Sequence, residues 1–278
     1  MTQVRTWLEP VDYSNYTFIK VDVDDGGIAT VWLNSPETLN AVGPEEHREM
    51  EHVWVDLARD NSIKAIILTG AGKAFSAGGD VKRMAARAGT EYGLEYALRV
   101  PQNTLRLFEH MLLTPQPVIA AVNGDAIGLG MTIALFADVA VVADDARLGD
   151  THVKVGMVAG DGGAVIWPML IGPQRAKEFL MRGKLVRGAE AVAMGLMNHA
   201  VPKEDVLAEA RKIAEEIAAN PVWAVRWTKA SINKELKSQL NQILELSIAY
   251  ESMTMLTEDY KEATSAFAEK RKPVFKGY

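Results

Sequence analysis

The stretch KAIILTGAGKAFSAGGDVKRM, residues 64–84, contains the features that decide the fold. KAIILTG is a short apolar run closed by glycine, which is typical of a strand buried on both faces of a parallel sheet. AFSAGGD is a glycine-rich loop, and VKRM after it opens a helix. The segment therefore predicts a strand–loop–helix unit of an α/β domain.

The same order of elements recurs on both sides of this segment. A second buried strand at 118–124 leads into the glycine loop and helix DAIGLGMTIALFAD, 125–138, and then into the strand VAVVA, 139–143. Upstream, residues 17–34 indicate a hairpin, and residues 40–60 have helical spacing. Alternating apolar strands and helices predict an α/β fold with a covered, mostly parallel sheet.

After about residue 205 the pattern becomes entirely helical. We therefore expect an α/β core over residues 1–204 and a helical region over 205–278. The helical region is too small to form a stable core of its own. Its apolar stripe should pack on the core or on a neighbouring subunit; the stripe consists of Leu240, Leu244, Ile248 and Met255.

Composition narrows the class of protein. A net charge of −6 and a pI near 5.5 argue against binding to nucleic acid or to a membrane surface. The chain has no cysteine, and its five histidines show no paired spacing, so no metal site is expected. No apolar run is long enough to span a bilayer, and residues 1–20 lack an apolar signal core. We expect a soluble, cytoplasmic protein.

Two glycine loops remain as candidate chemistry after other motifs are rejected. GAGKAF lacks the spacing of a phosphate loop, and GLGMTI lacks the third glycine of a dinucleotide fingerprint. The loops at 77–80 and 128–130 each follow a buried strand and open a helix, where main-chain N–H groups are unpaired. Two such ends side by side would stabilise an oxyanion. The alternative is that these glycines only make tight turns.

These residues resemble the crotonase, or enoyl-CoA hydratase/isomerase, superfamily from about residue 17 to the C-terminus. The resemblance is carried by KAIILTGAGKAFSAGGDVKRM, PVIAAVNGDAIGLGMTIALFADVAVVADDARLG, VGMVAGDGG and TEDYKEATSAFAEKRKPVF. It implies a spiral of ββα turns, a helical C-terminal trimerisation region and assembly as a trimer or a dimer of trimers. It also implies lyase chemistry on an acyl-CoA substrate, with coenzyme A as part of the substrate and no tightly bound cofactor.

By position, the resemblance implies that the N–H groups of Gly79 and Leu129 form the oxyanion hole. The family more often has glycine where Leu129 stands, but only its N–H is required. The resemblance further implies a set of substrate-binding residues: Ala77, Asp80, Lys82, Gly128, Thr132 and Gly160.

The acid–base residues depart from the family pattern. Hydratases of this family typically use two glutamates around one water, and here Thr132 and His152 occupy their positions. Threonine cannot act as a general base near neutral pH, so the two-carboxylate mechanism does not transfer. His152 could replace it as the base, with Asp161 fixing its tautomer. The alternative for Asp161 is the N-cap of the helix that follows it.

Three interpretations of function stay open. The first is a hydratase/isomerase-type enzyme that stabilises an enolate and has altered acid–base groups. The second is a retro-Claisen C–C hydrolase, because THVKVGMVAGDGGAVIWP, 151–168, also resembles the crotonase-fold β-diketone hydrolases, and His47 falls near another histidine of that group. The third is a non-catalytic member that binds CoA or a partner. Glu251, common in the family, discriminates little.

The sequence does not specify the acyl group. Residues 85–100, which have a mixed pattern and look mobile, are expected to shape its pocket together with Trp167 and Met131.

Overall fold

The computed structural model describes residues 11–278. Residues 1–10 lie outside the described residues. The prediction of a core region over 1–204 and the statement that residues 1–20 lack an apolar signal core both include these ten residues. In the described part, the strands are β1 (Ile19–Val23), β2 (Ile28–Leu33), β3 (Ala65–Gly70), β4 (Val118–Val122), β5 (Ala126–Ile127), β6 (Val139–Ala143), β7 (Arg147–Gly149), β8 (Val186–Arg187) and β9 (His199–Val201). The α-helices are α1 (Pro44–Arg59), α2 (Val81–Arg87), α3 (Glu91–Leu113), α4 (Leu129–Leu135), α5 (Gly163–Ile171), α6 (Pro173–Arg182), α7 (Gly188–Ala193), α8 (Val206–Ala218), α9 (Val222–Thr254) and α10 (Glu258–Ala268).

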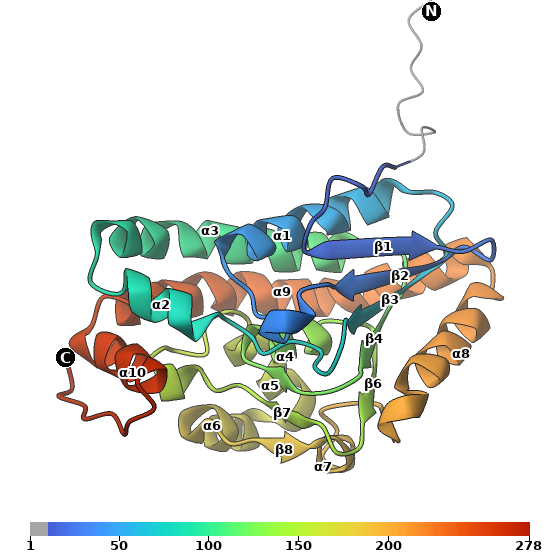
Figure 1. Ribbon diagram of the computed structural model, residues 1–278. Coiled ribbons are helices and arrows are strands. Elements are labelled where there is room, and N and C mark those ends of the chain that lie inside the picture. The colour runs from blue at the N-terminus through green and yellow to red at the C-terminus, as the bar shows by residue number, and fades with distance from the viewer. Residues whose placement is uncertain (1–10) are drawn as a thin grey trace, which may run out of the picture.

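The larger sheet has the strand order β1-β2-β3-β4-β6-β9. Its first pair is the predicted antiparallel hairpin, and every other neighbouring pair is parallel. All residues of β3 and β4 are buried, as their apolar sequences predict for strands covered on both faces. The helix α8 packs against β3, β4 and β6, so the helical region is part of the same core (Figure 1).

The smaller sheet, β5-β7-β8, lies beside the glycine loops. β5 leads directly into α4, and β3 leads through the loop at 71–80 into α2. Each loop therefore connects a strand to a helix N-terminus, as predicted. These arrangements confirm the mixed α/β class with a helical C-terminal region.

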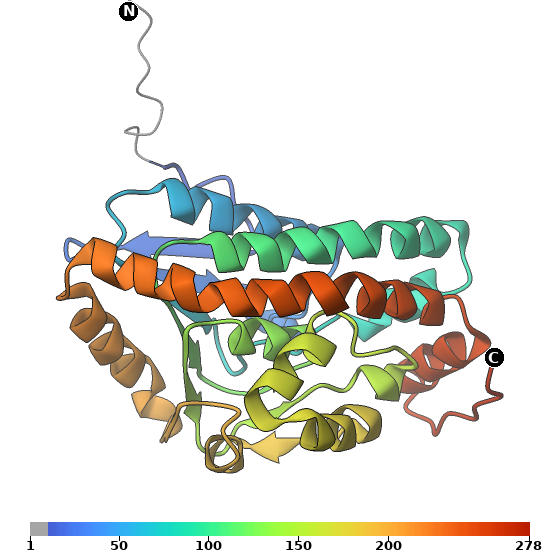
Figure 2. The same ribbon diagram turned by 180° about the vertical axis from the view of Figure 1, so that it is seen from behind.

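Two long helices, α3 and α9, lie side by side along the back of the molecule (Figure 2). Leu240 and Leu244 of α9 enter the main core, while Ile248 and Met255 join a second apolar cluster with Met84. The predicted stripe therefore packs on the core of its own chain. A role of residues 205–278 in trimer formation stays a prediction.

The segment 85–100 is mostly helical. Helix α2 runs to Arg87 and α3 begins at Glu91, with the Thr90 side chain accepting a hydrogen bond from the Gly93 N–H. Its mixed pattern arises because apolar side chains such as Leu94 and Leu98 lie on the exposed side of α3.

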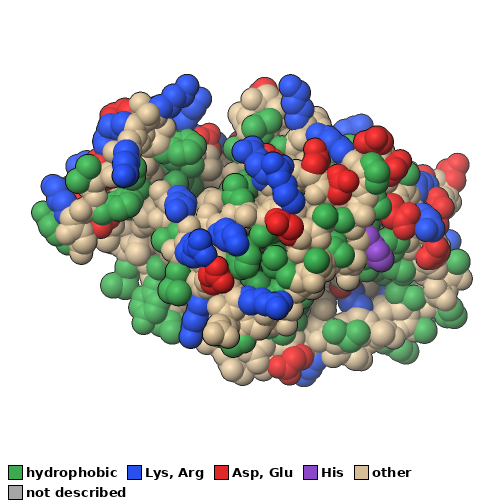
Figure 3. Space-filling view, turned by 90° about the horizontal axis from the view of Figure 1, so that it is seen from below, with side chains coloured by type: hydrophobic (Ala, Val, Ile, Leu, Met, Phe, Trp, Pro, Cys, Tyr) green, Lys and Arg blue, Asp and Glu red, His purple; other side chains and the backbone are tan. Residues whose placement is uncertain are grey.

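Between residues 11 and 278, no helix is both long and apolar enough to cross a membrane. The face seen from below carries basic side chains interspersed with acidic and apolar ones (Figure 3).

Candidate active site

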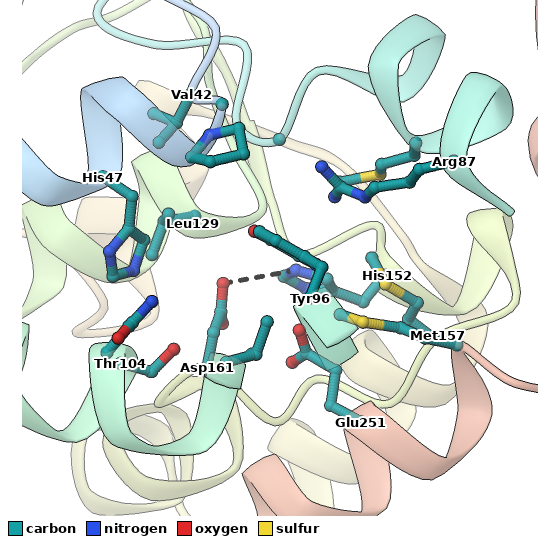
Figure 4. A pocket seen from close by; sticks show the side chains of 17 residues that line it. Val42, His47, Arg87, Tyr96, Thr104, Leu129, His152, Met157, Asp161 and Glu251 are labelled. Carbon is teal, nitrogen blue, oxygen red and sulfur yellow. Dashed lines mark ion pairs between the residues drawn. The ribbon is translucent and has the colours of Figure 1, made fainter. Parts of the chain in front are cut away.

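A cavity that opens to solvent lies between the glycine loops, the turn before α5, and helices α1, α2, α3 and α9 (Figure 4). The cavity is lined by Val42, Gly43, Pro44, His47, Gly79, Met84, Arg87, Tyr96, Val100, Asn103, Thr104, Leu129, His152, Met157, Asp161, Glu251 and Met255. It thus contains both predicted oxyanion donors and both predicted proton-handling side chains.

The two glycine loops are in direct contact along their main chains. The Ile127 N–H donates to the Ser76 carbonyl at 3.0 Å. A Cβ atom added to Gly78, whose φ is +77°, would lie only 2.3 Å from the Ile127 carbonyl oxygen, and one on Gly130 would lie 2.6 Å from Ser76 Cβ. Glycine is therefore needed at both positions so that the loops can approach this closely.

The N–H groups of Gly79 and Leu129 have no hydrogen-bond acceptor among residues 11–278. On either side of Gly79, Val42 N–H donates to the Gly78 carbonyl and Asp80 N–H donates to the Val42 carbonyl, which fixes the loop without using the N–H of Gly79. Leu129 is the first residue of α4, so its N–H has no partner within the helix. Both groups belong to residues that line the cavity.

His152, at the start of a 3-10 helix (His152–Val155), has a carboxylate at each ring nitrogen. Its Nε2 lies 3.2 Å from Oδ2 of Asp161, and its Nδ1 lies 2.7 Å from Oδ1 of Asp150. All three side chains are buried. The contact with Asp161, which the sequence left open, is present, and Asp150 is a partner that sequence reasoning missed.

The helix-cap interpretation of Asp161 is wrong. The cap position of α5 is Gly162, with φ +102°, and no side-chain bond caps the helix. Asp161 instead accepts from the Thr132 hydroxyl at 3.3 Å. Thr132, at the position of a usual family glutamate, thus supports a carboxylate that comes from another segment.

The pKa values of two groups in this cluster are raised, for different reasons. Burial lowers the pKa of His152, but the adjacent Asp150 and Asp161 charges outweigh burial and hold that pKa well above 6.5. Burial raises the pKa of Glu251 to about 8; Asp161 and Asp150 add to the rise, and His152 opposes it. Near neutral pH the cluster therefore contains an imidazolium and a neutral carboxylic acid.

Glu251 reaches the cavity from α9, 91 residues after its hydrogen-bond partner Gly160, whose N–H donates to Oε2 at 3.0 Å. The Gly160 carbonyl accepts from Ser247 of the same helix. Sequence reasoning did not select this glutamate, because nothing near it in the chain indicates burial beside His152. His47 also lines the cavity, with its Nδ1 3.0 Å from Glu51.

The predicted substrate-binding residues have other neighbours. The predicted set consists of Ala77, Asp80, Lys82, Gly128, Thr132 and Gly160. None of these six is among the described residues that line the cavity. Asp80 caps α2 by accepting from the N–H groups of Lys82 and Arg83, and Lys82 is exposed. Gly128 lies behind the His152 ring. Contacts of Ala77, Asp80 and Lys82 with the CoA portion stay a prediction.

Two further expectations concern apolar residues and metal. Trp167 and Met131 are fully buried in the main core and are not among the described cavity residues, so their predicted role in shaping the pocket is wrong.

Asp150, His152 and Asp161 offer ligand atoms within 4.8 Å of one another, a spacing that a metal ion could also use. The expectation of no metal stays a prediction.

The fold and the site define a class: an α/β protein of the crotonase type in which two free main-chain N–H groups share a cavity with a buried histidine–carboxylate cluster. The chain belongs to the enoyl-CoA hydratase/isomerase family, whose family model matches residues 24–278.

Individual relatives agree with this assignment over most of the chain. A Thermus thermophilus relative is 38% identical over 92% of this chain and 100% of its own length. The short-chain-enoyl-CoA hydratase of Clostridium acetobutylicum is 33% identical, over 89% of this chain and 94% of its own. The crystal structure of an enoyl-CoA hydratase/isomerase from Mycobacterium paratuberculosis aligns with a TM-score of 0.85 and 34% identity, covering 91% of this chain and 99% of that one.

Proposed function

We propose that this chain acts on acyl-CoA thioesters, with the thioester oxygen held by the N–H groups of Gly79 and Leu129. The proposal depends on one observation: these unpaired donors line the same cavity as His152 and Asp161. Negative charge that develops on the oxygen as an enolate forms would meet donors that are already in position. Coenzyme A is then part of the substrate.

Proton transfer in this proposal belongs to His152 and Asp161 as a unit. Because His152 keeps its proton near neutral pH, the accepting atom is a carboxylate oxygen of Asp161, and the imidazolium stabilises that carboxylate. In hydration, water oxygen bonds to the β-carbon, its proton passes to Asp161, and the double-bond electrons move to the thioester oxygen. Return of that proton from Asp161 to the α-carbon re-forms the thioester carbonyl and completes a 3-hydroxyacyl-CoA. Thr132 and His152 stand at the positions of the usual glutamate pair, and in this proposal Asp161 supplies the carboxylate that they lack.

C–C bond hydrolysis is a second candidate, favoured by the His152–Asp161 contact at 3.2 Å. Water would add to a ketone carbonyl of a β-diketone or β-keto thioester. The adjacent C–C bond would break, and its electrons would form an enolate held by the same N–H groups. Protonation of that enolate yields a carboxylic acid and a shortened thioester or ketone.

Mass spectrometry of products separates the candidates. The purified protein is incubated with crotonyl-CoA, with 3-ketoacyl-CoA thioesters and with a cyclic β-diketone. We expect addition of one water to crotonyl-CoA without cleavage. Two fragments from a β-keto substrate would instead identify the hydrolase. Binding of CoA thioesters without any turnover would contradict both and support the non-catalytic interpretation.

A further inference from the structure

Arg87, the last residue of α2, places a buried guanidinium at the cavity. Its side chain is 8% exposed, and it lines the cavity together with Gly79, Leu129 and Asp161. Arginine remains charged at any pH that a folded protein tolerates. A charge buried this deeply is costly unless a partner compensates it.

No protein carboxylate supplies that partner among residues 11–278. Arg87 takes part in no ion pair there, whereas Arg83, one turn earlier on α2, is paired with Glu45 and Glu46. Arg226, which is equally buried, donates to the Ile63 carbonyl. Arg87 therefore differs from both a surface arginine and a buried structural one.

The carboxylates that do line the cavity are already engaged elsewhere. Asp161 faces His152 and Thr132, and Glu251 accepts from the Gly160 N–H. Asp150, behind the ring, is bonded to His152 Nδ1. The cavity thus holds a hydrogen-bonded histidine–carboxylate cluster on one side and a cation without an ion-pair partner on the other (Figure 4).

The Arg87 guanidinium is positioned by an aromatic ring. Its Cζ atom lies 3.8 Å from the centroid of Tyr96, which comes from α3. Stacking on the ring covers one face of the planar group. The neighbouring hydroxyls of Tyr96 and Tyr260 are neutral, so they leave the charge of the guanidinium without an anionic partner, and its five N–H donors exceed what these hydroxyls use. Two parallel N–H donors in a plane match the geometry of a carboxylate.

We propose that the acyl part of the substrate carries a second, free carboxylate and that Arg87 binds it. The inference rests on the proposed function, because Arg87 lines the same cavity as the Gly79 and Leu129 donors that would hold the thioester oxygen, which brings the adjoining acyl group to this cation. Arg87 and Tyr96 also line an adjoining hollow between the start of α3 and α10, which gives space for acyl chains of different lengths. The substrate class is thus a monothioester of a dicarboxylic acid.

Calorimetric titration with unreactive saturated thioesters tests this assignment. Succinyl-, glutaryl- and adipyl-CoA are compared with butyryl-, pentanoyl- and hexanoyl-CoA, which match them in chain length but end in a methyl group. We expect at least one carboxylated thioester to bind about tenfold or more tightly than its methyl counterpart, as for a hydrogen bond between charged groups. Arg87→Met should abolish that preference and leave the affinity for the methyl series within about threefold.

Matched variants locate the effect. Arg87→Lys keeps a charge without the planar fork and should retain only part of the preference. Arg83→Met removes a nearby charge that is already paired and should leave the preference intact. Equal binding of both series, or a preference that survives Arg87→Met in a folded protein, would overturn the inference while leaving the proposed function standing. Failure of every thioester to bind would overturn the proposed function as well.

Discussion

The two sides of the cavity are built in different ways. Gly79 and Leu129 contribute main-chain N–H groups from two loops that touch along their backbones. The proton-handling side uses side chains of Asp150, His152 and Asp161, with Glu251 reaching in from α9. The first side depends on backbone conformation, and the second depends on the identity and charge of each side chain.

This difference bears on the departures from the family pattern that we propose at Leu129 on one side and at Thr132 and His152 on the other. Every residue except proline has an N–H group, so leucine at 129 does not change the donor. Replacing a glutamate with Thr132 removes an ionisable group, and the charge must then come from elsewhere in the cluster. The comparison predicts that function is sensitive to side-chain identity at His152 and to loop geometry at Gly78.

The largest effect is expected from removing the imidazole. His152→Ala should lower kcat/KM at least about 100-fold, as for the loss of an acid–base group. It also leaves Asp150 and Asp161 buried without their shared cation, which should reduce stability by about 3–5 kcal/mol. Steady-state kinetics and chemical denaturation measure the two effects. Near-normal turnover would remove His152 from the mechanism.

Asp161→Asn separates catalysis from folding. The amide oxygen can still accept a hydrogen bond from His152 Nε2, and the amide NH2 group can donate to the Thr132 hydroxyl, which is also an acceptor, so the shape of the cluster is kept. It cannot accept a proton from water near neutral pH. A similar fall of about 100-fold, with a smaller loss of stability, is expected.

Gly78→Ala tests the main-chain side. The new Cβ would meet the Ile127 carbonyl at 2.3 Å, and alanine is strained at φ +77°. The loops must separate, so kcat/KM should fall about tenfold, and the free energy of unfolding should fall by about 1–3 kcal/mol.

Leu129→Met is the matched control for Gly78→Ala. It changes a side chain on the same side of the cavity and keeps both the N–H group and the volume. Its activity should stay within about threefold of the parent. A large loss in Leu129→Met, with Gly78→Ala unaffected, would mean that side-chain packing rather than N–H geometry controls this side.

Much of the fold follows from local sequence. The apolar runs of β3 and β4 and the glycines that follow them are features of neighbouring residues, and the structure has the predicted strands and loops there. The segment around Tyr92 and Leu94 could not be assigned this way. Its exposed apolar residues obscure the helical period, and Thr90 alone marks the start of α3.

The site was only partly predictable, because local sequence indicates contacts between residues that are close in the chain but not between distant segments. His152 and Asp161 are nine residues apart, and the turn between them made a contact foreseeable. Asp150 gave no signal, because a carboxylate two residues before a histidine is ordinary in any sequence. Glu251 and Arg87 act through contacts between distant helices, so their burial becomes visible only when α2, α3 and α9 are packed together.

Glu251 gives the most subtle test of the side-chain region, through the pH dependence of stability. Its pKa in the folded protein is about 8, above the ordinary 4.5, because it is buried beside Asp161 and Asp150. Between these pH values the folded protein retains a proton that the unfolded chain releases, so stability should fall as pH rises from about 4.5 to 8. His152 acts in the same direction: its contribution is complete below pH 6.5 and is lost as pH rises through its raised folded pKa.

Glu251→Gln removes one of these two contributions and keeps an oxygen that can accept from Gly160. The variant should therefore lose less stability than the parent between pH 5 and 8, by on the order of 1–3 kcal/mol, in urea denaturation at each pH. Glu245→Gln, on the exposed side of the same helix, should behave like the parent. Parallel pH profiles for the parent and Glu251→Gln would mean that Glu251 is ionised in the folded protein at pH 7. The cavity would then carry one more negative charge, and Glu251 would compete with Asp161 for the role of the carboxylate that accepts the proton from water.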